Sequence, residues 1–181
     1  MTPKTFLADC DSPIGPLVLA SDGQSITGLW MRDQKYFGST LPRGQEPLRA
    51  ELPVFDAARR WLDLYFAGRD PGAAPPLAPA GSPFRQAVWA ALRRIPYGGL
   101  TTYGQIARAL ERQGGRRVSA QAVGGAVGHN PISILIPCHR VVGSGGSLTG
   151  YAGGVEKKLF LLKLEGAPLD GLFTPKKGTA L

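Results

Sequence analysis

A cysteine and a histidine stand side by side in the segment IPCHR, at residues 136–140. The chain has only two cysteines and two histidines, so the pairing of Cys138 with His139 marks a candidate reactive site. A thiol near its ordinary pKa is mostly protonated at neutral pH, and a nucleophilic cysteine therefore needs a base beside it. Consecutive residues of an extended chain point to opposite sides, so a turn or a bridging water would have to couple the two side chains. A buried structural cysteine is the alternative interpretation.

A carboxylate further along the chain could orient the histidine. The segment VEKKLFLLKLEG, at residues 155–166, repeats apolar residues at helical spacing and ends at a glycine. Glu165 would lie in the last turn of this helix, where the helix dipole disfavours an anion by a few tenths to about 1 kcal/mol. A carboxylate in that position suggests a partner, and a cysteine, a histidine and an orienting carboxylate form a known activation scheme. Cys138, His139 and Glu165 are therefore the candidate catalytic set.

The elements before Cys138 must place it in the fold. The apolar run ISILI, at residues 132–136, predicts a buried strand that leads to the cysteine. Upstream, residues 82–130 predict three helices, of which the last two resemble a helix-turn-helix unit. The predicted helix starts are Ser82 with Pro83, Thr102 with Gln105 as a capping box, and Ser119.

The last of these predicted helices, AQAVGGAVG at residues 120–128, has almost no large side chains. Glycine inside a helix costs about 0.5–1 kcal/mol relative to alanine, so its presence there needs a cause. Close approach of another surface is one cause. That surface could be the core of the protein itself or the narrow groove of DNA.

The charge of the chain is concentrated in its second part. The net charge is +8 with a pI near 9.9. Residues 1–81 carry 8 Lys and Arg against 9 Asp and Glu, whereas residues 82–181 carry 13 against 4. A basic second part suits a polyanion such as nucleic acid, although a solvated basic surface has the same composition.

A change of composition divides the chain. Residues 68–83, GRDPGAAPPLAPAGSP, are rich in proline and lack apolar periodicity, which is typical of a connector. Before them, residues 14–31 predict two strands joined by a turn, and residues 54–68 predict an amphipathic helix. We expect a first domain over residues 1–80, a second domain over residues 81–170 and a tail over residues 171–181.

Several kinds of site are disfavoured by what the sequence lacks. No signal-peptide pattern and no bilayer-length apolar run occurs, so a membrane location is not expected. Two cysteines without an export signal indicate a reducing, cytoplasmic setting. No CxxC or HxxxH pair occurs, so no metal site is predicted. The glycine-rich segment 143–154 lacks the spacing of a dinucleotide or phosphate-binding loop, and no cofactor is predicted.

The segment NPISILIPCHRVVGSGGSLTGYAGGVEKK strongly resembles the active-site signature of the O6-alkylguanine-DNA alkyltransferases, the methylated-DNA–protein-cysteine methyltransferases. The resemblance covers roughly residues 82–167, and it continues more loosely through SPIGPLVLA and LYFAG in the first part. It implies an α/β plus α fold, with a small N-terminal ribonuclease-H-like sheet domain followed by a C-terminal winged-helix-like helix-turn-helix domain.

The resemblance also implies a DNA-repair activity. Cys138 would take the alkyl group from O6-alkylguanine, and from O4-methylthymine, and would keep it, so each molecule would act once. Such a protein is a methylated-DNA–[protein]-cysteine S-methyltransferase that needs no cofactor. Its expected partner is double-stranded DNA that contains O6-alkylguanine. The protein is expected to be a monomer and to lie in the cytoplasm.

Roles for individual residues follow from the same resemblance. His139 would accept the thiol proton through a water, with Glu165 behind it. Asn130 would tie the helix-turn-helix to the active-site loop, and Tyr103 would crowd the phosphate of the flipped nucleotide and assist protonation of the leaving guanine. The residues implied to contact DNA are Thr102, Tyr103, Ser119, Gln121, Ala122, Gly125, Arg116, Arg117 and Arg140, and those implied to line the base pocket are Pro137, Tyr151 and Ala152.

The sequence departs from the family pattern at two positions. Gln121 stands where relatives often have an arginine finger that fills the gap left by the flipped base, and Arg116 or Arg117 could supply that charge instead. Ala152 stands where some relatives have serine. The alternatives to an alkyltransferase are a non-catalytic protein that binds alkylated DNA, a cysteine-histidine thiol hydrolase and a plain winged-helix regulator.

Overall fold

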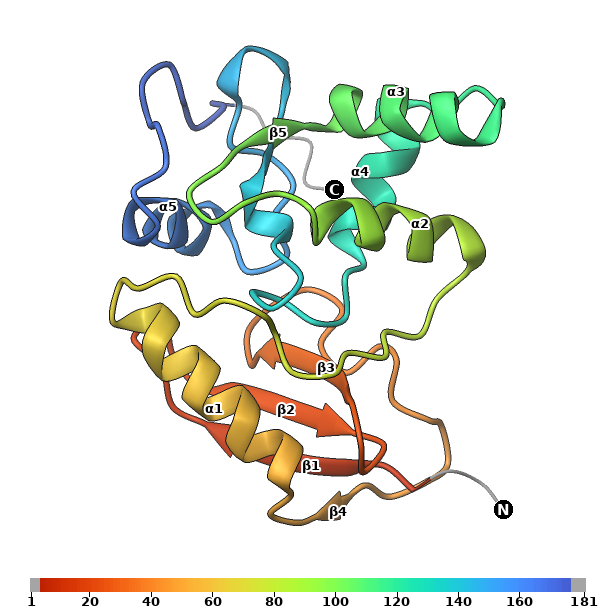
Figure 1. Ribbon diagram of the computed structural model, residues 1–181, viewed down its shortest axis with the longest axis vertical. Helices are drawn as coiled ribbons and strands as arrows, with labels where there is room; N and C mark the ends of the chain where they lie inside the picture. The colour runs from red at the N-terminus through yellow and green to blue at the C-terminus, as the bar shows by residue number, and fades with distance from the viewer. Residues whose placement is uncertain (1–3, 177–181) are drawn as a thin grey trace. The chain divides into compact units, whose positions relative to one another are not determined.

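The computed structural model describes residues 4–176 of the 181-residue chain, which divide into two compact units (Figure 1). The first unit holds the residues up to Ala80 together with Pro131–Leu135, and the second holds Gly81–Asn130 and the residues from Ile136 onward. The return of Pro131–Leu135 to the first unit is not visible in the sequence. Part of the predicted tail, residues 177–181, lies outside the described residues.

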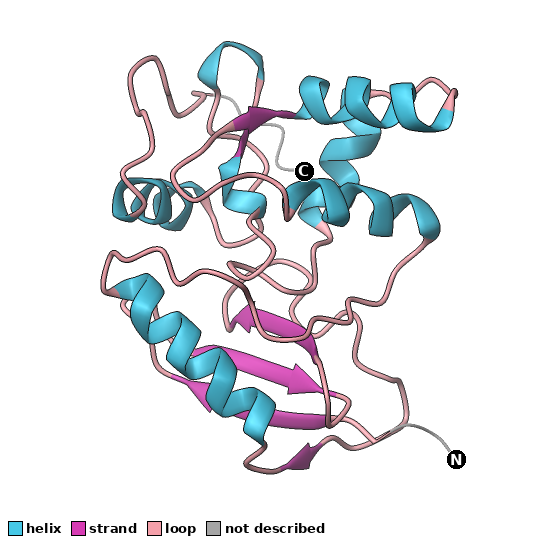
Figure 2. Cartoon of the chain, viewed as in Figure 1, coloured by secondary structure: helices cyan, strands magenta, loops and turns pink. Residues whose placement is uncertain are grey.

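A four-stranded sheet in the order β3-β2-β1-β4 forms the first unit (Figure 2). β1 (Phe6–Cys10), β2 (Leu17–Ser21) and β3 (Ile26–Met31) are antiparallel neighbours in that sequence, and the short β4 (Leu48–Arg49) pairs in parallel with β1. The two strands predicted within residues 14–31 are β2 and β3, which confirms that prediction. All residues of β2, which lies between two strands, are buried, and α1 contacts β2 and β3.

The helix α1 (Pro53–Phe66) packs across this sheet (Figure 1). Proline in its first turn has no N–H to leave unpaired, which suits a helix start. The helix ends before Gly68, whose positive φ of 74° is a backbone conformation that glycine adopts without strain. The buried face comprises Val54, Phe55, Ala58, Trp61, Leu62 and Tyr65.

Three helices open the second unit: α2 (Pro83–Leu92), α3 (Tyr103–Gly114) and α4 (Ala120–Gly128). Each begins at its predicted cap. The Ser82 and Ser119 hydroxyls accept hydrogen bonds from the N–H groups of Arg85 and Ala122. Thr102 and Gln105 form the reciprocal capping box. These caps satisfy N–H groups that the helices themselves leave unpaired, and the three predicted starts are confirmed.

The remaining elements of the second unit are short turns and strands and one further helix. A short turn of 3-10 helix, η1 (Cys138–Arg140), leads into β6 (Val141–Val142), which pairs in parallel with β5 (Thr101–Thr102). A second short turn, η2 (Ser144–Gly146), is followed by α5 (Val155–Leu164). Of the helices within residues 4–176, none has both the length and the apolar character needed to cross a bilayer.

The strand predicted over residues 132–136 is absent from the described chain, and that prediction was wrong. The residues are buried as expected, but they form only single bridge positions, at Ile132, which pairs with Leu29 of β3, and at Ser133 and Ile136. The cause is Ile134, whose φ of 69° turns the backbone out of the extended region. Apolar character indicated burial here, but it could not distinguish a strand from a buried turn.

Candidate active site

Cys138 lies at the start of η1, and this turn determines how it relates to His139. Pro137, before it, has φ −80° and ψ 64°, and the Cys138 N–H donates to the Ile136 carbonyl at 2.8 Å. Since residues 138–140 form a helical turn, the two side chains are not on opposite sides of an extended strand. The thiol is buried, with 5% of the residue exposed.

Burial raises the pKa of the Cys138 thiol. Four groups oppose this effect in part: the Asn130 side chain, which hydrogen-bonds the sulfur, the charge of Lys158, and the backbone N–H groups of Cys138 and His139. Desolvation is the largest cause, so the resting group is a thiol and not a thiolate. A base must therefore take its proton when it reacts.

His139 is the candidate for that base. Its Nε2 lies 2.6 Å from Oε1 of Glu165, and both side chains are fully buried. Burial lowers the pKa of His139, and the Glu165 carboxylate opposes this only in part, so the imidazole is neutral rather than half of an ion pair. A neutral ring that donates from Nε2 to a carboxylate carries its lone pair on Nδ1. Glu165 thereby sets the tautomer in which Nδ1 can accept a proton.

The Glu165 carboxylate is held by more than the histidine. Arg140 donates to both of its oxygens, at 2.8 and 3.0 Å, and the Gly98 N–H donates to Oε2 at 3.1 Å. Glu165 follows α5 directly, where the helix dipole disfavours a negative charge. These donors compensate for that unfavourable position. They explain why a carboxylate occurs at this helix end.

Arg140 is not placed as the sequence indicated. We predicted a DNA contact, but Arg140 is buried, and a third hydrogen bond joins it to the Ile95 carbonyl at 2.7 Å. Its guanidinium also lies 5.8 Å from the centre of the Tyr97 ring. The guanidinium is thus engaged inside the second unit, and its role is to hold Glu165.

Asn130 connects the end of α4 to the cysteine. The side chain is buried, and its Nδ2 donates to the Ile136 carbonyl at 2.9 Å. The same carbonyl accepts the Cys138 N–H. Because Asn130 also hydrogen-bonds the sulfur, it bridges α4, the turn at Pro137 and the thiol, which is the position that the resemblance implies for it.

Lys158 is a site residue that the sequence analysis missed. The side chain is fully buried, and Nζ donates to the carbonyls of Val141 and Thr149 at 2.5 and 2.8 Å. Burial lowers its pKa to about 8, and Cys138 acts in the opposite direction. A signal was available: Lys158 falls between Val155 and Leu162 on the apolar stripe of α5, where an exposed lysine is not expected.

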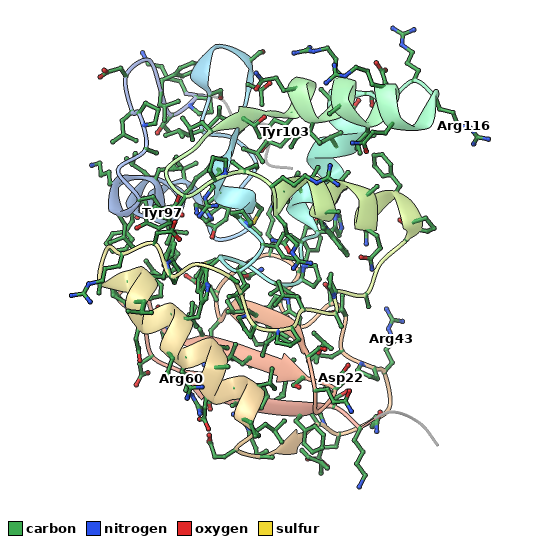
Figure 3. The ribbon with its side chains drawn as sticks, in the orientation of Figure 1. Asp22, Arg43, Arg60, Tyr97, Tyr103 and Arg116 are labelled. Atoms are coloured by element: carbon green, nitrogen blue, oxygen red, sulfur yellow. The ribbon has the colours of Figure 1, made fainter. Side chains whose placement is uncertain are left out.

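Two tyrosines complete the buried cluster (Figure 3 labels Tyr103). The Tyr103 hydroxyl donates to the Thr149 carbonyl at 3.0 Å, and burial raises the pKa of this phenol. The Tyr151 ring lies edge-on to His139, with 6.5 Å between ring centres, and burial raises its pKa as well. Within residues 4–176 the Tyr151 hydroxyl has no hydrogen-bond partner.

The face of α4 that is predicted to meet DNA is exposed and nearly smooth. Ser119, Gln121 and Ala122 are exposed, whereas Val123, Gly124, Ala126 and Val127 are buried on the opposite face. A Cβ added at Gly125 would meet nothing within 4 Å. Packing against the protein itself therefore does not require glycine at this position, and an outside surface becomes the better explanation.

The other predicted contact residues lie at several depths. Arg116 and Arg117 are exposed between α3 and α4, and Arg116 extends away from the ribbon (Figure 3). Thr102 and Ala152 are partly buried, and Pro137 is buried next to Cys138. Among the described residues, no group of three or more His, Cys, Asp and Glu side chains could hold a metal ion.

Comparisons with known proteins identify the family to which the chain is similar. Residues 5–78 match the ribonuclease-like domain of 6-O-methylguanine DNA methyltransferase, and residues 83–167 match its DNA binding domain. The chain is 46% identical over 158 residues to a methylated-DNA–protein-cysteine methyltransferase of Haemophilus influenzae, which covers 87% of this chain and 84% of the relative. The relative from Mycobacterium leprae is 47% identical over 155 residues, with 86% and 88% covered.

Solved structures show the same likeness. A crystal structure of the Mycobacterium tuberculosis O6-methylguanine methyltransferase aligns with a TM-score of 0.76 at 43% identity, and covers 92% of this chain and 96% of its own. A structure of Mycobacterium tuberculosis OGT in complex with DNA aligns with a TM-score of 0.75 at 42% identity, with 91% and 96% covered.

Proposed function

This chain belongs to the 6-O-methylguanine DNA methyltransferase family, and on that premise we propose that Cys138 is the residue that accepts the alkyl group. The function of the chain is DNA repair by alkyl transfer to a cysteine. The observation that supports Cys138 is its place in one buried turn with His139, whose imidazole is hydrogen-bonded to Glu165. Cys10, the other thiol, lies in β1, where its charged neighbours are Arg59, Asp63 and Asp11 and no histidine is among them.

The proposed reaction begins with removal of the thiol proton. Nδ1 of the neutral His139 takes this proton through a water, and Glu165 stabilises the imidazolium that forms. The sulfur attacks the alkyl carbon in line with the bond to O6. The S–C bond forms as the C–O6 bond breaks, and the electron pair of the broken bond goes to the guanine.

Tyr103 is proposed to supply a proton to the leaving guanine. Because burial raises the pKa of this phenol, it keeps its proton at neutral pH and can donate it as negative charge develops on the base. The product on the protein is a thioether, whose sulfur has no proton to lose and is a poor nucleophile. The transfer is therefore irreversible, and each molecule acts once.

DNA carrying O6-alkylguanine is the proposed substrate. The smooth, exposed face of α4 and the exposed Arg116 and Arg117 suit close approach to a duplex, with the target base rotated out of the stack. The similar Mycobacterium tuberculosis protein was solved in complex with DNA. The monomeric state, the cytoplasmic location and activity on O4-methylthymine stay predictions.

The rival functions fit the site less well. A thiol hydrolase would leave the smooth face of α4 without a role. A non-catalytic binder of alkylated DNA, or a plain winged-helix regulator, would not need a buried thiol beside a histidine that is hydrogen-bonded to a carboxylate, itself held by an arginine. The buried set Cys138, His139 and Glu165 therefore favours transfer.

The test is stoichiometric methylation measured by mass. The protein is incubated with duplex DNA that carries labelled O6-methylguanine, and we expect one methyl group per molecule, located on the peptide that contains Cys138. The Cys138→Ala variant should accept none and still bind DNA, because phosphate contacts supply most of the affinity. Cys10→Ser is the matched control and should react like the parent. A methyl group found on Cys10, or repeated turnover, would overturn the assignment.

A further inference from the structure

The segment Pro131–Leu135 leaves the second unit after Asn130 and belongs to the first unit. The N–H of Leu29, in β3, donates to the Pro131 carbonyl at 2.9 Å, and the Ser133 N–H donates back to the Leu29 carbonyl at 2.9 Å. The segment is therefore bound to β3 by two backbone hydrogen bonds. The chain then continues directly through Ile136 and Pro137 to Cys138.

A strained turn lies within this segment. The Leu135 N–H donates to the Ser133 carbonyl at 2.8 Å, which makes a γ-turn centred on Ile134. The φ of Ile134 is 69°, a value that is unfavourable for a β-branched residue. Such a conformation persists only when its surroundings impose it. The turn after it is relaxed, because Pro137 has the dihedral angles of an inverse γ-turn.

Gln34 provides one of the constraints on this segment. It is a buried polar side chain, with 6% of the residue exposed. Its Oε1 accepts the Met31 N–H at 2.8 Å and the Ser133 hydroxyl at 3.2 Å, while its Nε2 donates to the Lys35 carbonyl at 3.3 Å. The amide is thus anchored at the end of β3, and the same oxygen that caps the strand also holds Ser133.

We propose that Gln34 is a positioning residue for alkyl transfer: anchored at the end of β3, it holds Ser133 and so maintains the strained turn at Ile134 through which the chain reaches Cys138. This inference rests on the proposed function of Cys138. An apolar side chain at residue 34 could fill the same volume, but it could not accept a hydrogen bond from the Ser133 hydroxyl.

The test uses single-turnover kinetics on duplex DNA with O6-methylguanine. Because each molecule reacts once, the amplitude reports the folded, active fraction and the rate constant reports the reaction. We expect Gln34→Leu and Ser133→Ala each to lower the rate constant about tenfold, with unchanged DNA affinity, since small misplacements of reacting groups cost factors of this order or more. The double variant should be no slower than either single one. Gln34→Glu keeps an acceptor oxygen and should recover part of the rate.

Gln24→Leu is the matched control, because Gln24 is exposed in the turn between β2 and β3, and its rate constant should equal that of the parent. A lower amplitude with the parental rate constant for both Gln34→Leu and Ser133→Ala would show a purely structural role and overturn the proposal. If Gln34→Leu does not fold, Ser133→Ala alone tests the proposal, and a parental rate constant in that variant would overturn it. A failure of the proposed role of Cys138 can be told apart from a failure of the Gln34 proposal, because it would appear as methylation of the Cys138→Ala variant.

Discussion

Nε2 of His139 lies 2.6 Å from Oε1 of Glu165, and both side chains are fully buried in the second unit. Burial keeps the imidazole neutral, and the carboxylate orients its lone pair. Arg140 compensates the charge of Glu165 from the other side. The structure thus places a neutral imidazole of defined tautomer in the same turn as the thiol.

Loss of this base should slow the transfer without preventing DNA binding. We expect His139→Gln and Glu165→Gln to lower the single-turnover rate constant by roughly 10²–10⁴-fold, the range for general acid–base assistance. Rates are measured with duplex DNA and, separately, with free O6-benzylguanine. Glu156→Gln is the control, since Glu156 is exposed in the first turn of α5. Parental rates in both active-site variants would contradict the relay.

The dependence of the transfer rate on pH should show that the pKa of His139 is lowered. His139 is the base only when it is neutral, so the rate should persist below the ordinary value of about 6.5 and fall at lower pH. The stability of the fold, like the rate, should decrease as the pH falls. Because the unfolded histidine binds a proton at higher pH than the folded one, the free energy of unfolding decreases as pH falls below about 6.5.

The measurement is the rate with O6-benzylguanine against pH, together with urea unfolding over the same range. His139→Gln supplies the control, in which this inflection should be absent. An inflection in the parent at or above about 6.5 would contradict a buried, neutral imidazole.

Gly125 should matter for DNA and not for the fold. A Cβ at this position has open space, and alanine is favoured over glycine within a helix by about 0.5–1 kcal/mol. We therefore expect Gly125→Ala to raise the free energy of unfolding by that order and Gly125→Leu to fold normally. Gly125→Leu should nevertheless bind duplex DNA at least tenfold more weakly, because a large side chain keeps α4 from the groove.

Reaction of Gly125→Leu with free O6-benzylguanine separates these effects, since a small base does not need the face of α4. The rate with this base should equal that of the parent. Unchanged DNA affinity in Gly125→Leu would show that this face of α4 does not meet DNA.

At Ile134 the glycine variant should be more stable than the alanine variant, the reverse of the usual order. Ile134→Ala and Ile134→Gly both lose a buried side chain, but only glycine accepts a φ of 69° without strain. We expect Ile134→Gly to be the more stable of the two by about 1 kcal/mol in urea unfolding, given the cost of the left-handed region. The same pair at Ile132, which is also buried but has no positive φ, is the control and should not favour glycine. If the alanine variant is the more stable one at both Ile134 and Ile132, the turn is not strained.

Much of the second unit could be read from the sequence because the decisive interactions are local. The hydroxyls of Ser82, Thr102 and Ser119 bond N–H groups three residues ahead, so their signals lie within a few letters. Glu165 was also visible, because an anion at a helix end contradicts a local rule and so suggests a partner. The adjacency of Cys138 and His139 needed no structure at all.

Three features were decided only by tertiary structure. Arg140 and Lys158 carry charges, and a charged side chain becomes favourable in the interior only where partners are supplied. Glu165 and Ile95 supply them for Arg140, and Val141 and Thr149 supply them for Lys158. The segment 132–136 is apolar in either a strand or a buried turn, since exclusion of water is all that its composition specifies. Hydrogen bonds between this segment and Leu29 and Gln34, about a hundred residues away, select the turn. Composition thus determines which residues are buried, whereas partners distant in the sequence determine the conformation in which they are held.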